Sequence, residues 1–124
     1  MARNPARLEV FQRAHHLVLD IYRLTGRLPT AERFGLCSQL RRAAVSIPTN
    51  VVEGATRRTP NDFHRFLDIA VGSAAEVRYL IQLAIDLRML TADDAAGCLD
   101  CSDHVFRQLQ NLQKTVRGFA DRRP

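Results

Sequence analysis

The sequence lacks any long apolar run. None of its apolar stretches approaches the ~18–20 residues that a transmembrane helix needs, so no membrane-spanning segment is expected. The first residues are polar and include Arg3 and Arg7, and no apolar stretch of about 7–15 residues follows them, so a secretory signal peptide is not expected either. These absences predict a cytoplasmic protein without a membrane partner.

Proline and glycine are also scarce. Five prolines and six glycines interrupt the 124 residues, which favours regular secondary structure. Hydrophobic residues make up 46% and charged residues 25%, which are ordinary values for a globular domain. Because a chain of this length buries a sufficient core without disulfides or metals, we expect one domain over residues 1–124.

Cysteine is rare, and the motifs of the common enzyme classes are missing. Cys37, Cys98 and Cys101 are an odd number in a chain without a signal peptide, which predicts free thiols. Cys98, Cys101 and His104 recur at three-residue steps, but on a helix the outer two point about 120° apart, whereas zinc needs four converging ligands. The sequence has no glycine-rich phosphate loop, nucleophile motif or HExxH pattern. We therefore expect core cysteines, no metal, no cofactor and no catalytic site.

Lysine is nearly absent, although the chain is basic. The formal net charge is +5, and 17 of the 18 basic residues are arginine. Arginine binds carboxylate and phosphate through a planar, bidentate fork, so this composition favours fixed contacts with anions. A GC-rich genome would enrich arginine in the same way, and composition alone leaves both explanations open.

Apolar residues are plentiful and recur at three- and four-residue steps, the period of an amphipathic helix. Four helices are predicted, at about 8–27, 31–56, 60–88 and 92–119. Their short connections predict an all-α, up-down-up-down antiparallel four-helix bundle. The inner stripes are expected to be Leu8, Phe11, His15, Val18, Tyr22 and Leu24 in the first helix, Leu36, Leu40, Ala43, Ile47 and Val51 in the second, Phe63, Phe66, Ala70, Ala74, Val77, Ile81 and Ala84 in the third, and Leu99, Val105, Leu109, Leu112, Val116 and Phe119 in the fourth.

Helix boundaries are indicated by capping residues. Thr30, Thr59 and Thr91 each precede a predicted helix and are expected to cap it, with Pro60 at the first position of the third helix. Pro48 lies inside the second predicted helix, where it removes one backbone hydrogen bond. Because the apolar period continues in phase across Pro48, we expect a kink there and not a break.

The two middle helices have more apolar surface than one bundle needs. Residues 43–52 and 69–75 are uncharged, whereas a surface helix of a monomer normally has a polar outer face. The positions expected to face outward are Val45, Pro48 and Val52 on the second helix and Gly72, Ala75, Tyr79 and Leu83 on the third. Self-association would cover them, although scattered exposed apolar residues also occur on ordinary monomers.

Basic residues gather at one end of the predicted bundle, where the chain start, the second connection and the chain end meet. This end receives ten of the 18 basic residues: Arg3, Arg7, Arg13, Arg57, Arg58, Arg65, Lys114, Arg117, Arg122 and Arg123. Such a cluster can bind the phosphates of RNA or DNA. It lacks interleaved aromatics, so base stacking is not expected. A solvated end without a specific ligand is the simpler alternative.

Charged residues at the edges of the uncharged zones are expected to orient the helices or a subunit contact. Antiparallel register places Arg42 level with Glu76, and Glu53 level with His64 and Arg65. Glu53 also precedes Arg57 by four residues, which is a favourable spacing for a helical ion pair. Arginine neighbours would keep both glutamates ionised, which disfavours acid–base catalysis.

Two segments resemble a known family. The stretch from Gln39 to Gly54, together with Phe63 to Ser73 and the following Glu76, resembles the four-helix bundle proteins encoded in intervening sequences of 23S ribosomal RNA. The matching motif positions are Gln39, Arg42, Ser46, Asn50, Glu53, Gly54, Ser73 and Glu76. Val52 departs from the usual alanine before Glu-Gly, and we expect no effect on the fold.

The resemblance implies assembly as well as fold. These proteins are similar to the accessory variability protein of diversity-generating retroelements, a basic homopentamer that binds nucleic acid and a reverse transcriptase. A ring of five copies is therefore expected. Two functions remain open: an oligomeric scaffold that binds nucleic acid through the arginine-rich end, and an adaptor that binds an acidic protein without nucleic acid. An enzyme or metalloprotein is the least favoured interpretation.

Overall fold

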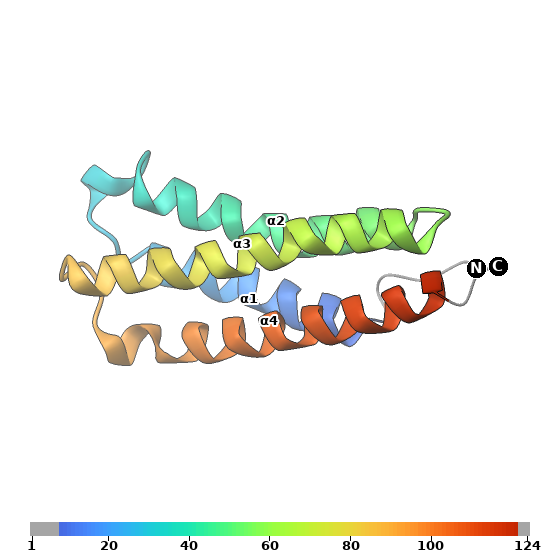
Figure 1. The fold of residues 1–124 in the computed structure, drawn as a ribbon. Helices are drawn as coiled ribbons and strands as arrows, with labels where there is room; N and C mark the ends of the chain where they lie inside the picture. Colours follow the sequence, from blue (N-terminus) through green and yellow to red (C-terminus); the bar gives the residue numbers. More distant parts are fainter. Residues whose placement is uncertain (1–7, 122–124) are drawn as a thin grey trace.

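The computed structural model describes residues 8–121, which fold into four long α-helices and one short 3₁₀ helix. These elements are α1 (Glu9–Thr25), η2 (Thr30–Glu32), α2 (Leu36–Ala55), α3 (Pro60–Asp86) and α4 (Ala92–Asp121). Figure 1 shows the long helices running alternately in opposite directions, and contacts link α1 to α2, α2 to α3, α3 to α4 and α4 to α1. The predicted all-α four-helix bundle is confirmed. In the described part of the chain, no helix is both long and apolar enough to cross a bilayer.

Two of the three predicted caps form as expected. The Thr59 hydroxyl accepts a hydrogen bond from the Asp62 amide at 3.2 Å, with Pro60 at the first helical position. The Thr91 hydroxyl accepts one from the Asp94 amide at 3.0 Å. Each bond satisfies a backbone donor that has no partner within its own helix. The threonines thus fix the starts of α3 and α4.

The second helix begins later than predicted. Residues 31–35 were expected to be helical, but the chain forms the short 3₁₀ helix η2 and a turn before α2 starts at Leu36. Thr30 makes no side-chain cap. Instead, the Glu32 carboxylate accepts a hydrogen bond from the Leu36 amide at 3.2 Å. Because η2 ends before α2 begins, Arg33 and Phe34 lie in the connection between them and not in a helix.

Pro48 lies within α2, and the helix continues on both sides of it. Figure 1 shows a continuous α2 whose first half slopes away from α3 and whose second half runs along it. Pro48 is itself buried. It therefore belongs to the core of this chain, which corrects the expectation that it faces outward.

The core confirms the predicted stripes of α2 and α3 in the main, confirms that of α4 in part, and corrects that of α1. In α4, Val105, Leu109 and Val116 are buried, whereas Phe119 is exposed. In α1 the buried residues are Val10, Ala14, Leu17, Ile21, Leu24 and Thr25. His15 and Tyr22, expected inside, are exposed. Both stripes have the helical period, but burying an imidazole and a phenol would require polar partners inside the bundle. The observed stripe avoids that cost with apolar side chains.

Gly54 allows a close approach between α2 and α3. A Cβ atom at this position would lie 2.8 Å from Phe63 Cδ1 and 2.9 Å from Phe66 Cβ, which is closer than van der Waals contact allows. The missing side chain lets Phe63 fill the core, where it is fully buried. Gly54 thus fixes how tightly the α2–α3 hairpin closes beside the basic end.

Candidate nucleic-acid interface

The basic end is formed by the α2–α3 turn, the first turns of α3 and the last turns of α4. Figure 1 shows the α2–α3 turn and the end of α4 at the same end of the bundle. Five of the predicted residues lie at this end, and we call them the arginine end. They are Arg57, Arg58, Arg65, Lys114 and Arg117.

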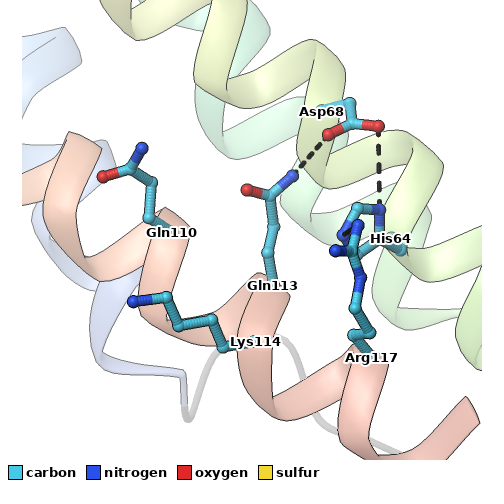
Figure 2. A pocket seen from close by; sticks show the side chains of 6 residues that line it. All are labelled: His64, Asp68, Gln110, Gln113, Lys114 and Arg117. Atoms are coloured by element: carbon cyan, nitrogen blue, oxygen red, sulfur yellow. Dashed lines mark hydrogen bonds and ion pairs between the residues drawn. The ribbon is translucent and has the colours of Figure 1, made fainter. Parts of the chain in front are cut away.

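A cavity of ≈ 300 Å³ lies between α3 and α4 at this end. Figure 2 shows Asp68 between His64 and Gln113, with Arg117 beside His64. The His64 Nδ1 atom lies 3.6 Å from Asp68, Gln113 donates to the same carboxylate, and Arg117 Nη2 lies 3.2 Å from His64 Nε2. Arginine can only donate, so Nε2 of His64 is the acceptor in this contact. Arg117 is thus held by a ring nitrogen and not by a carboxylate.

Phe66 holds two more arginines. The Arg57 guanidinium lies 4.6 Å from the centre of the Phe66 ring, and that of Arg65 lies 5.7 Å from it. Stacking on an aromatic ring restricts a long side chain without neutralising its charge. Arg65 also contacts Asp62 at 3.5 Å. The arginine end is therefore partly ordered by an aromatic ring that the sequence pattern assigned only to the core.

The charge of the arginine end is incompletely neutralised. Asp62 and Asp68 contact Arg65 and His64. Within residues 8–121, the cations that form no ion pair with a carboxylate include Arg57, Arg58, Lys114 and Arg117. Unpaired arginines at one end provide a positive field that attracts an external anion.

The remaining predicted residues are not part of the described cluster. Arg13 forms an ion pair with Glu9 at 3.7 Å, and its backbone carbonyl accepts a contact from Cys101. Cys101 is roughly four turns of α4 from Arg117, so Arg13 lies along the bundle and not at its arginine end. The predicted residues that lie outside the described range are Arg3, Arg7, Arg122 and Arg123.

The outer faces of α2 and α3 are less apolar than expected but keep exposed hydrophobic residues. Val45 is 39% exposed, Tyr79 is 63% exposed, and Ile69, which was not predicted, is 49% exposed. Val52 is half-buried, whereas Gly72 and Ala75 are exposed. Pro48 contributes nothing to this surface because it is buried.

Residues of the family motif converge on a second cavity, between α2 and α3. Its lining residues are Gln39, Arg42, Ala43, Ser46, Ser73 and Glu76. The hydroxyls of Ser46 and Ser73 lie 2.8 Å apart, and the Asn50 amide donates to the Ser46 carbonyl at 2.7 Å. This polar bridge joins α2 to α3, so part of the motif serves the helix pairing itself.

The predicted ion pairs of the middle helices do not form. Arg42 and Glu76 line the same cavity, as antiparallel register predicts, but neither forms an ion pair within residues 8–121. Glu53 likewise lacks one in this range, because α2 ends at Ala55 and the turn directs Arg57 onto Phe66. An i,i+4 pair requires both residues on a continuing helix.

A third surface does not follow from the sequence pattern. A groove of ≈ 660 Å³, which we call the α2 groove, runs along the outer side of α2 from the η2–α2 connection. Its lining includes Tyr22, Arg33, Phe34, Arg41, Arg42 and Val45, and none of its lining residues is acidic. Phe34 is 88% exposed. The Arg33-Phe34 pair was the available signal, but both residues were assigned to a helix.

Two of the three cysteines, Cys98 and Cys101, have thiols with raised pKa values. Burial, with nearby Asp20, raises the pKa of the Cys98 thiol to about 11, and burial also raises the pKa of Cys101. Metal binding requires thiolates. Within residues 8–121, no group of three histidine, cysteine or acidic side chains is placed to hold a metal ion.

Comparison with known proteins agrees with this fold. Residues 6–111 match the family model of the 23S rRNA-intervening sequence protein. A crystal structure of a protein of unknown function from the S23 ribosomal protein family of Bacteroides thetaiotaomicron is similar, with a TM-score of 0.79 and 24% identity over 85% of this chain and 98% of that chain. At this identity the likeness shows the fold alone. No curated protein matches the sequence.

Proposed function

The chain belongs to the 23S rRNA-intervening sequence protein family, and from that premise we propose that it is a non-catalytic, homo-oligomeric scaffold that binds the backbone of RNA or DNA through its arginine end. The observation that supports this most is the set of cations without a carboxylate partner in the described chain, Arg57, Arg58, Lys114 and Arg117. The cytoplasm is the proposed compartment.

The chemistry of the arginine end suits phosphate. Arginine offers two parallel donors to a phosphate group, and Arg57 and Arg117 are held by Phe66 and His64 without losing charge. The described residues of the arginine end offer charged donors for phosphate, so contact with the nucleic-acid backbone should depend little on base sequence. Repeating the end in an oligomer multiplies the phosphate contacts.

Self-association is supported by the surface that one bundle leaves open. Val45, Ile69 and Tyr79 are exposed apolar side chains on α2 and α3, and Gly72 and Ala75 would let a second backbone approach. Arg42 and Glu76 have opposite charges without an ion pair in the described chain. We propose a homopentamer, the subunit number that the family resemblance implies.

A binding titration tests the arginine end. We expect the protein to bind a labelled RNA or DNA duplex more weakly as salt rises, because binding releases counterions. The double variant Arg57→Glu/Arg58→Glu should weaken binding severalfold or more. It should also reduce the slope of log affinity against log salt by about 1 for each phosphate that the variant no longer neutralises.

The matched control changes the net charge equally at the other end of the bundle. Arg23→Glu/Arg88→Glu should leave duplex affinity within about twofold at moderate salt, where charges beyond a Debye length are screened. Equal weakening in both double variants would show that net charge alone matters. If neither duplex nor single-stranded probes bind at low salt, nucleic acid is not the ligand and the acidic protein partner is favoured.

A further inference from the structure

We propose that the α2 groove binds a single-stranded segment of nucleic acid, with a base stacked on Phe34 and phosphates held by Arg33 and Arg41. This rests on the proposed function in one respect, the ligand class. It adds a second surface with a different preference, because the arginine end contacts only a backbone.

The groove is built for an anion. Arg33 and Arg41 line it, and none of its lining residues is acidic. Arg41 is held in place, since its Nε donates to the Thr25 hydroxyl at 2.9 Å and its Nη2 to the Tyr22 carbonyl at 3.3 Å. A guanidinium fixed in this way loses little entropy when it binds an external phosphate.

The same groove offers aromatic faces. The Arg41 guanidinium lies 4.5 Å from the centre of the Tyr22 ring, and that of Arg33 lies 5.4 Å from the Phe34 ring. Phe34 is 88% exposed, so it contributes little to the core of this chain. Exposing a phenyl ring to water is unfavourable unless a partner covers it. A nucleobase covers such a ring by stacking.

Length and chemistry together favour a single strand. Between Cys37 and Asn50 the groove follows α2 for about 20 Å, which is room for several nucleotides. A duplex hides its base faces inside the stack and could use only the arginines. An acidic helix of a protein would supply carboxylates but no flat face for Phe34. The phosphates and exposed bases of a single strand match a lining that combines arginines with aromatic rings.

The test is a titration with a labelled oligothymidylate of about 16 nucleotides, which does not pair with itself, beside a duplex probe. Phe34→Ala should weaken oligothymidylate binding about fivefold or more, because removing one base–aromatic stack costs about 1–3 kcal/mol. Phe34→Tyr keeps an aromatic ring and should bind oligothymidylate within about twofold of the wild type. Neither variant should change the affinity for the duplex.

Leu87→Ala is the matched control, because Leu87 is also an exposed apolar residue beside an arginine in a connection at the same end of the bundle (Figure 1). It should leave both affinities unchanged. Wild-type binding of duplex but not oligothymidylate overturns this inference and leaves the arginine end intact. Unchanged oligothymidylate affinity in Phe34→Ala overturns it as well. If Phe34→Ala instead lowers the solution mass, the groove is an interface between copies and the inference is wrong.

Discussion

Gly54 lets α2 and α3 approach closely at the turn that joins them. The position matters because the phenyl rings of Phe63 and Phe66 occupy the space that a side chain would need. Phe63 is part of the core, and Phe66 holds Arg57. A single hydrogen atom in place of a side chain thus links the packing of the hairpin to the order of the arginine end.

Replacing Gly54 by alanine should therefore destabilise the fold. Overpacking costs about 1–3 kcal/mol, of which the better helix propensity of alanine returns at most about 1 kcal/mol. Gly97→Ala in α4 is the control, because a Cβ there meets nothing within 4 Å. It should raise the free energy of unfolding by about 0.5–1 kcal/mol. Chemical denaturation measures both, and equal stability of the two variants would show that a side chain at position 54 is tolerated.

Side-chain partners were the least predictable feature at this scale. Register correctly placed Arg42 level with Glu76, yet no ion pair forms between them. Register and spacing also suggested Glu53 as a partner of Arg57, which lies on Phe66 instead. Long charged side chains have several nearby partners of similar energy, and an exposed ion pair is only slightly more stable than the same two charges solvated by water. Sequence patterns therefore locate such residues without fixing what they contact.

At the scale of single elements, the caps distinguish what sequence could and could not predict. Thr59 and Thr91 precede long apolar periods and cap α3 and α4. Thr30 precedes a period that begins several residues later, and it starts only the short η2. The phase of α1 was missed for a related reason: two neighbouring stripes share the same period, and only packing against α2 and α4 selects one.

The caps give a direct prediction. Thr59→Ala removes the hydroxyl that accepts from the Asp62 amide and should lower the free energy of unfolding by about 1 kcal/mol. Thr30→Ala should change it by less than about 0.5 kcal/mol, because that side chain caps nothing. Thermal or urea unfolding of the two variants compares them. A larger decrease in Thr30→Ala would show that η2 supports the fold more than its hydrogen bonds suggest.

At the scale of the whole molecule, the bundle and its order of helices followed from apolar periodicity and short connections. The two cationic surfaces were not equally predictable from the sequence. The arginine end was predictable because its residues cluster in sequence near turns, whereas the α2 groove required the correct start of α2. Figure 1 places the η2–α2 connection and the α2–α3 turn toward opposite ends of the bundle.

The mass of the particle in solution tests the central claim, which is that the exposed surfaces of α2 and α3 are buried between copies of this bundle. Light scattering coupled to size-exclusion chromatography gives the molar mass independently of the shape of the particle. We predict a particle of about 70 kDa, five chains of 14.0 kDa each. A single 14.0 kDa species at micromolar concentration, with Val45, Ile69 and Tyr79 open to water, would contradict this claim.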